Sequence, residues 1–226
     1  MNSTEPAPRR GRPPKGASRL SRDAIVAATL AVIGGEGVAA VSMRTVAKVL
    51  GVDPKSLYNH VDGKEGLLDA VAERILGAIE LPAPGGDTRD DLRRIAHAFR
   101  ASAFAHPEAA SLVLTRRLGS TAALAPTDAV LRVLAAAGFP PDRAVHVLRF
   151  LLAALTGALL REHQAAPDFG TEATAVDARR AVLDSAALPA VAAAADHLAR
   201  FDRDAEFAFT VEAAIDAVMV QAGPAG

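Results

Sequence analysis

The chain has 226 residues, of which 50% are hydrophobic and 4% aromatic, and its formal net charge at pH 7 is −1. This hydrophobic fraction supports a buried core and excludes global disorder, and the absence of cysteine excludes disulfides, thiolate metal sites and cysteine nucleophiles. No apolar run reaches the roughly 18 to 20 residues of a membrane span, and the basic N-terminus lacks the apolar segment of a secretory signal, so we expect a cytoplasmic protein without a membrane partner.

The small net charge hides a basic N-terminal arm. Residues 1–22 carry six cations against Glu5 alone, a charge of +5, which leaves −6 for the rest of the chain. Residues 1–19, rich in Pro, Arg and Gly, should form a disordered arm. Within it, Arg9 to Lys15 resembles an AT-hook, which binds the narrow minor groove of A·T-rich DNA. Because its second proline replaces a cation, an arm that binds phosphates without sequence preference is the alternative.

Helical spacing and capping residues predict four helices in the next part of the chain. Ser21 begins the first, which ends in the glycine-rich stretch 34–37, and Ser42 caps the second, which ends at Gly51. A short third helix covers residues 54–61, and a fourth covers residues 64–81. Prolines and glycines at 82–86 then separate this part from the rest.

Seven further helical stretches follow, without the alternation that a strand would show. Prolines stand at or near several of their starts, where a missing N–H costs little, and Gly138 fits a C-cap. The sequence therefore predicts an all-α fold with a three-helix N-terminal domain, a linking helix and a larger helical domain, divided at 1–19, 20–66 and 67–226. The expected helices are 88–105, 107–118, 127–137, 142–165, 175–183, 189–199 and 203–220.

Residues 42–61 read as a helix-turn-helix. Gly51 permits the positive φ of a tight turn, Ala47 is small where the two backbones approach, and Leu57 seals the angle between the helices. Structural helical corners share these features. The second helix adds side chains of the kinds that contact base edges and phosphates: Lys55, Ser56, Tyr58, Asn59 and His60.

These residues belong to a longer resemblance. Leu20 to Leu76 resembles the N-terminal domain of the tetracycline-repressor (TetR) family of bacterial transcription regulators, through VSMRTVAKVLGV at 41–52 and SLYNHVDGKEGLL at 56–68. The C-terminal half is similar mainly in architecture, with a final helix from Phe201 to Val218. The resemblance implies a homodimeric repressor that binds a palindromic operator in double-stranded DNA and that a small-molecule effector releases.

The resemblance also implies which residues contact DNA. Two would lie on the first helix of the reading unit and touch phosphate or a base edge, the recognition helix would enter the major groove, and the start of the fourth helix would hold the backbone. Asn59 stands where close relatives of the tetracycline repressor often have a bulky aromatic, so no operator sequence is implied. Structural roles are the alternative for Tyr58 and His60. The implied residues are Arg44, Thr45, Lys55, Ser56, Tyr58, Asn59, His60 and Lys64.

A ligand-responsive regulator needs a cavity whose shape differs between two states. The helices between residues 88 and 165 could enclose one that combines apolar lining with polar groups, and this composition favours an apolar or aromatic effector. Plain core packing is the alternative for each phenylalanine. The candidates are His97, Phe99, Arg100, Phe104, His106, Leu114, His146, Phe150 and Leu151.

Helices 142–165 and 203–220 should pair with their symmetry mates in a four-helix dimer interface. Leucines recur there at intervals of three and four residues, and Ala154, Gly157 and Ala158 allow close approach. The leucines are Leu148, Leu152, Leu155 and Leu159.

Other functions are less well supported. Scattered histidines give no paired metal motif, and Arg161 to His163 is interpreted as a solvated helix end, so we expect no metal and no other cofactor. Neither a phosphate-binding glycine loop nor a serine nucleophile motif is present, so we expect no enzyme. A helical adaptor that binds a protein through its helical corner is the alternative from another class.

Overall fold

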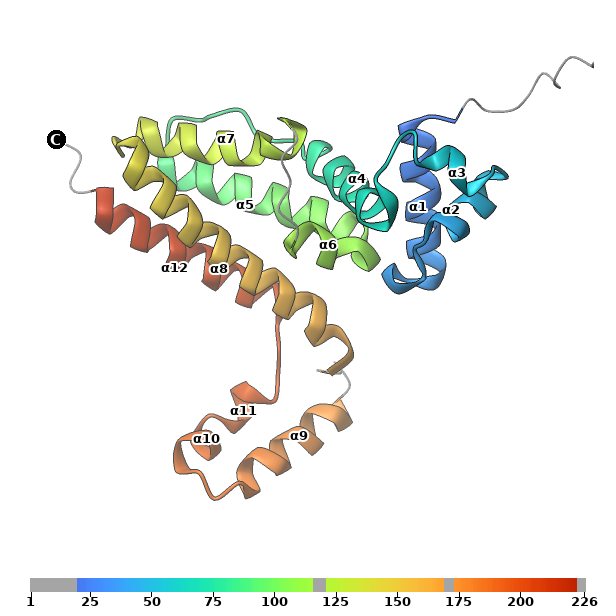
Figure 1. Ribbon diagram of the computed structural model, residues 1–226. Coiled ribbons are helices and arrows are strands. Elements are labelled where there is room, and N and C mark those ends of the chain that lie inside the picture. Colours follow the sequence, from blue (N-terminus) through green and yellow to red (C-terminus); the bar gives the residue numbers. More distant parts are fainter. Residues whose placement is uncertain (1–19, 116–120, 169–172, 223–226) are drawn as a thin grey trace, which may run out of the picture.

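The computed structural model describes residues 20–115, 121–168 and 173–222, and within these ranges every regular element is an α-helix or a 3-10 turn and none is a strand (Figure 1). The all-α prediction is confirmed for this part of the chain. The predicted arm, with its AT-hook-like segment, lies outside the described residues. The elements are α1 (Arg22–Glu36), η1 (Val38–Ala40), α2 (Met43–Leu50), α3 (Pro54–Leu57), α4 (Gly63–Gly77), α5 (Thr88–Ala105), η2 (Pro107–Ala109), α6 (Ala110–Thr115), α7 (Thr121–Ala136), α8 (Pro141–Asp168), α9 (Ala173–Ser185), α10 (Pro189–Ala193), α11 (Ala195–Leu198) and α12 (Arg203–Ala222).

The first helices begin at the capping residues that the sequence predicts. The Ser21 Oγ accepts a hydrogen bond from the backbone N of Ala24 at 3.1 Å, which satisfies one of the free N–H groups at the start of α1. Ser42 and Thr45 form a reciprocal capping box at the start of α2.

A first hydrophobic core joins the N-terminal helices to the larger domain. Ile25, Val46, Leu57 and Val71, from α1 to α4, are fully buried in it. Residues of η2, α6 and α7, including Leu112, extend the same core. The head formed by α1 to α4 is therefore packed on the larger domain, and a displacement of α6 or α7 would act on it directly. The predicted boundary at 66 and 67 falls within α4.

A second core holds α5, α7, α8 and α12 together, with Leu134, Leu159, Phe207 and Ile215 almost completely buried. α8 and α12 lie side by side, while α9, α10 and α11 pack on one another and stand away from the bundle (Figure 1). α5 is tied to α12 by Arg93, whose Nε and Nη2 donate to the Glu212 carboxylate at 2.5 and 3.0 Å.

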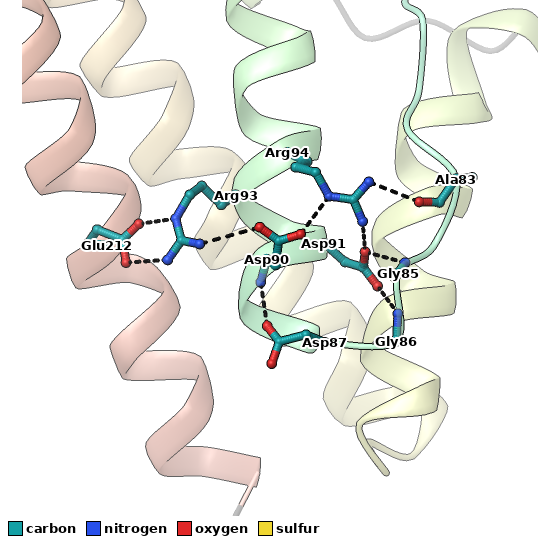
Figure 2. Close-up of polar contacts among 9 residues, drawn as sticks. All are labelled: Ala83, Gly85, Gly86, Asp87, Asp90, Asp91, Arg93, Arg94 and Glu212. Carbon is teal, nitrogen blue, oxygen red and sulfur yellow. Dashed lines mark hydrogen bonds and ion pairs between the residues drawn. The ribbon is translucent and has the colours of Figure 1, made fainter.

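The linker between α4 and α5 is pinned by a buried carboxylate (Figure 2). Asp91 accepts hydrogen bonds from the backbone N of Gly85 at 2.7 Å and of Gly86 at 3.2 Å, and it pairs with Arg94, which also donates to the carbonyl of Ala83 at 3.1 Å. The Gly85 donor, followed by the other donors, holds the pKa of Asp91 below its ordinary value despite the opposing effect of burial. These bonds hold the linker against α5, so a movement of α5 would carry the linker with it.

α7 begins earlier than the sequence analysis predicts. It starts at Thr121 rather than 127, so Pro126 lies inside the helix rather than at its start. The proline leaves one carbonyl without its intrahelical partner. The added residues bring Ala123 into the first core, and the burial of its methyl group favours the longer helix.

Other boundaries differ by a few residues. α4 ends at Gly77 because Ala78 leaves the helical conformation at φ −91° and ψ 0°. The helix predicted at 189–199 is divided into α10 and α11 at Ala194, and α8 continues to Asp168 through part of the predicted loop at 166–174.

The expectation that no segment is long and apolar enough to span a membrane is wrong, because one helix meets both criteria. Pro141–His163 in α8 has a mean hydropathy of 1.5 and is the one such helix among the described residues. Between Arg143 and Arg161 only Arg149 carries a charge, so the interruptions are too widely spaced to break the apolar window. α8 packs on α6, α7 and α12, which accounts for part of its apolar surface.

Candidate DNA-binding surface and ligand cavity

The turn between α2 and α3 has the predicted geometry. Gly51 has a φ of +65°, and the backbone N of Val52 donates to the Ala47 carbonyl at 3.1 Å, which closes the end of α2. Asp53 then caps α3, since its Oδ1 accepts from the backbone N of Lys55 at 2.8 Å, and Pro54 takes the first helical position.

The third helix is shorter than the predicted 54–61, because α3 ends at Leu57 and a turn follows. Together, α3 and this turn place a row of polar side chains around one buried anchor. Leu57 is fully buried, whereas Lys55 and Asn59 are exposed, and Tyr58 is 59% exposed. The structural alternative for Tyr58, a packed aromatic, does not hold in this chain. Ser56 and His60 are half-buried at the edges of the row.

The two predicted contacts on α2 differ in their surroundings. Arg44 is exposed. The Thr45 Oγ1 accepts from the backbone N of Ser42 at 2.9 Å and lies 2.9 Å from the carbonyl of Ala40, to which it donates. Its hydroxyl is therefore used by the capping box, and a DNA contact from Thr45 would have to share it.

Lys64 connects the start of α4 to the segment before α2. Its Nζ donates to the carbonyl of Ala39 at 3.2 Å, so the ammonium lies beside the reading unit. Arg22 supports the same region from α1, because it bonds the His60 carbonyl at 3.5 Å and the Glu73 carboxylate at 2.9 Å.

A cavity of about 500 Å³ lies between α5, α8 and the start of α12. We call it the α5–α8 cavity. It contains three of the predicted ligand residues, His97, Arg100 and Phe104. Its lining residues are His97, Arg100, Ala101, Phe104, Pro107, Glu162, His163 and Arg203.

An ion-pair network centred on Arg100 forms one wall of this cavity. The Arg100 Nε lies 2.9 Å from the Glu162 Oε2 and its Nη2 lies 2.6 Å from the Oε1, while Nη2 also contacts the Asp204 Oδ1 at 2.7 Å. The guanidinium carbon lies 4.6 Å above the Phe207 ring, against which the His97 ring packs edge-on at 5.1 Å. The hydrogen bonds that Arg100 donates to Glu162, and secondly to Asp204, raise the pKa of Arg100 further above its usual range despite the opposing effect of burial.

The network corrects one interpretation and adds three residues. Arg161 to His163 is not simply a solvated helix end, because Glu162 is buried against Arg100. Glu162, His163 and Arg203 line the cavity and were not among the predicted ligand residues. The only available signal was a single carboxylate near the end of an alanine- and leucine-rich helix.

Six predicted lining residues lie elsewhere. Leu114 is buried in the second core, and Phe99 packs between the two cores. His106 lines a separate cavity of about 500 Å³ between α1, α4 and α5, and Leu151 lines a narrow apolar groove of about 60 Å³ beside α12. The other two, His146 and Phe150, are one helical turn apart on the exposed side of α8.

The predicted dimer leucines divide into two groups. Leu148 and Leu159 are buried by the protomer's own helices, so they have no area left for a partner. Leu155 is half-buried, and Leu152 is exposed. Their exposed apolar neighbours on α8 and α12 include Phe150, Ala153, Gly157, Phe209, Ala213 and Val220.

Among the described residues, no group of three or more His, Asp or Glu side chains is arranged to hold a metal ion.

Two family models match the chain. The model described as "Bacterial regulatory proteins, tetR family" matches residues 25–71, and the model described as "Tetracyclin repressor-like, C-terminal domain" matches residues 81–221. The second alone covers more than half of the chain, and the two together cover the head and the larger domain.

Individual proteins show the same similarity. An HTH-type transcriptional regulator of Saccharopolyspora erythraea is 38% identical over 121 residues, which are 53% of this chain and about half (51%) of that protein. The class A tetracycline repressor protein from transposon 1721 of Escherichia coli is 31% identical over 163 residues, 71% of this chain and 75% of the repressor.

Solved structures agree in fold. Apo ActR from Streptomyces coelicolor superposes with a TM-score of 0.80 at 24% identity, covering 91% of this chain and 100% of ActR. At this identity the likeness concerns the fold alone. Together with the family models and the curated relatives, which are transcriptional regulators and not enzymes, it shows that the chain belongs to the TetR family of transcriptional regulators, with an N-terminal helix-turn-helix DNA-binding domain and a C-terminal ligand-binding domain.

Proposed function

We propose that this chain is a homodimeric cytoplasmic repressor that binds a palindromic operator and leaves it when a small molecule occupies the α5–α8 cavity. The observation that carries the proposal is the composition of α3, where exposed polar side chains surround the buried Leu57. A helix of four residues buries little area by itself. The exposed lysine of α3 and the exposed phenol and amide in the turn after it, on Tyr58 and Asn59, are suited to phosphates and base edges.

DNA contacts divide into two kinds. Lys64 and Arg44 supply charge for phosphates and would bind any sequence, whereas Lys55 and Asn59 stand on the recognition helix and would contact bases. The half-buried Ser56, with the exposed phenol beside it, completes this surface. Because each protomer carries one such surface, a palindromic site matches a two-fold dimer.

Dimerisation is supported by apolar surface that the protomer leaves exposed. On α12, Phe209 is 73% exposed and Val220 is also exposed, while α8 exposes Phe150 and the small residues Ala153 and Gly157. Pairing α8 and α12 with their symmetry mates would bury these side chains. The two recognition helices should then lie about 34–36 Å apart, or one further DNA turn away.

The cavity is coupled to the head through α5. The Ser102 Oγ on α5 donates to the carbonyl of Ile75 in α4 at 3.0 Å, and Ala101 lines both the α5–α8 cavity and the cavity between α1, α4 and α5. A ligand that displaces α5 would therefore move α4, and with it Lys64 at the other end of that helix. ActR has been crystallised with actinorhodin and with (S)-DNPA, which supports a ligand role for this fold.

A salt-dependent mobility shift tests the proposal. The full chain should shift the promoter DNA beside its own gene, and its affinity should fall linearly with the logarithm of salt concentration, because phosphate contacts release counterions. An unrelated promoter of equal length is the control. A protein that binds neither DNA at about 50 mM salt would refute the proposal and favour the adaptor alternative.

A further inference from the structure

We infer that the ligand of the α5–α8 cavity is an aromatic molecule with one anionic group, and that this group binds Arg203 and the Nη2 of Arg100 in place of Asp204. The inference rests on the proposed function, because it names the chemical class of the effector for the same cavity. Three observations support the inference: the charges of the lining, the rigidity of Arg100 and the exposure of Asp204.

The lining of the cavity favours an anion. It contains two guanidinium groups, on Arg100 and Arg203, but a single carboxylate, on Glu162. With both lining histidines counted as neutral, the lining carries a charge of +1, which is two cations less one anion, once the Asp204 carboxylate that shares the Arg100 Nη2 has been displaced. His97 and His163 add ring nitrogens that can donate hydrogen bonds, and protonation would add further positive charge. A cationic ligand would meet repulsion from Arg203, whereas the charge of Arg100 is already balanced by Glu162 and Asp204.

Arg100 is a preorganised donor. Its side chain is 19% exposed and that of Glu162 is 10% exposed, and the bidentate pair between them fixes the guanidinium plane from α8. Stacking on Phe207 holds the same plane from α12. A ligand anion that contacts Nη2 therefore binds a group whose orientation is already set, without the entropy loss of ordering a free arginine.

Asp204 is the replaceable partner. It shares Nη2 with Glu162 at 2.7 Å, but its side chain is 87% exposed, so water screens the pair. Arg203, its neighbour in the sequence, lines the cavity and has no ion-pair partner among the described residues. An anion between Arg203 and Arg100 would pair with two guanidinium groups and would displace only one exposed carboxylate, that of Asp204.

The remaining lining fits an aromatic body. Phe104 and Pro107 form an apolar part of the wall, and the imidazole of His97 adds a flat ring that is already packed against Phe207. Rings stack on such groups in offset or edge-on arrangements. A volume of about 500 Å³ accommodates two or three fused or linked rings beside the charged group.

A matched pair of fluorescent probes tests the inference. The anionic 8-anilino-1-naphthalenesulfonate and the neutral N-phenyl-1-naphthylamine share one aromatic skeleton, and the chain has no tryptophan to interfere. The full chain should bind the sulfonate about tenfold or more tightly than the neutral probe. This factor corresponds to the free energy of one hydrogen bond to a charged group. Arg203→Gln should remove most of that preference while changing the affinity for the neutral probe less than about twofold.

Two further variants locate the effect. Arg161→Gln, on α8 next to Glu162 but outside the cavity lining, should leave the preference unchanged. Asp204→Asn should strengthen sulfonate binding, because it removes the competing carboxylate from Arg100. Equal affinity for the two probes, or a sulfonate affinity that Arg203→Gln leaves intact, would overturn the inference.

The same preparations separate this inference from the proposed function. Promoter binding is measured for the wild type and for Arg203→Gln, and both should bind equally because Arg203 lies at the start of α12, which packs on α5 and α8. A wild type that binds its promoter but shows no preference for the sulfonate overturns only the anion assignment. A wild type that prefers the sulfonate but does not bind DNA overturns the proposed function and leaves the anion assignment standing.

Discussion

Replacing Glu162 by alanine should leave the Arg100 guanidinium with only an exposed carboxylate, that of Asp204, as its partner. The substitution removes the 2.6 and 2.9 Å contacts of the bidentate pair, in a place where only 19% of the arginine side chain is exposed. Breaking a buried ion pair from one side costs about 3–5 kcal/mol. Because Asp204 remains, we expect a loss near the lower end, about 3 kcal/mol.

In a chain of this length, each kcal/mol lowers the Tm by about 2–4 °C, so Glu162→Ala should melt about 6–12 °C below the wild type. Circular dichroism at one fixed protein concentration measures this, since association makes the Tm depend on concentration. A cycle with Arg100→Met isolates the pair. The double variant should lose less than the sum of the single losses, because no uncompensated charge is left buried.

Asp128→Ala is the matched control. This substitution breaks the ion pair between Asp128 and Arg132 on α7, whose nitrogen and oxygen atoms lie 3.1 Å apart. Both side chains are mostly exposed, so the loss should be about 1 kcal/mol or less. Losses in the Arg100 and Glu162 cycle that simply add, within about 0.5 kcal/mol, would refute the view that this pair is one coupled structural unit.

Lys64→Ala should weaken binding to all DNA sequences and flatten the salt slope by about one unit, whereas Asn59→Ala should alter preference at one base position; anisotropy titrations with operator variants measure both. Phe209→Arg should yield monomers in sedimentation at micromolar concentration, and Val49→Arg, at an exposed position on α2, should not; a dimeric Phe209→Arg would refute the proposed interface. The depressed pKa of Asp91 means that its stabilising contribution is present above its ordinary pKa of about 3.9 and is lost as the pH falls through the lowered pKa of the folded protein. Asp91→Asn should therefore reduce the loss of Tm in acid, and an unchanged acid profile would contradict this.

The head could be predicted from the sequence because its signals are local. The Ser21 and Ser42 caps bond backbone groups three residues away, and Gly51 needs only its own φ. The pattern of exposed polar residues around Leu57 is also local, since it lies within α3 and the turn that follows it. The family resemblance added roles to residues that were already marked by their chemistry.

The cavity could not be predicted in the same way, because its contacts join distant parts of the chain. Arg100 and Glu162 are 62 residues apart, and their pairing depends on how α8 is rotated against α5. α8 carries apolar residues on most of its circumference, so periodicity alone does not say which side faces inward. This is why Phe150 was assigned to the ligand site and Leu159 to the dimer, although the first is exposed and the second is buried in the core.

Ligand and operator should bind to different states of one protein, and the reciprocity of their effects on each other tests this most directly. A ligand found by thermal-shift screening is titrated calorimetrically into the free protein and into the protein saturated with operator DNA. A coupling of about 1–3 kcal/mol predicts that operator weakens ligand binding roughly five- to 150-fold, by the same factor as the ligand weakens operator binding. Equal ligand affinities in the two titrations would contradict the account.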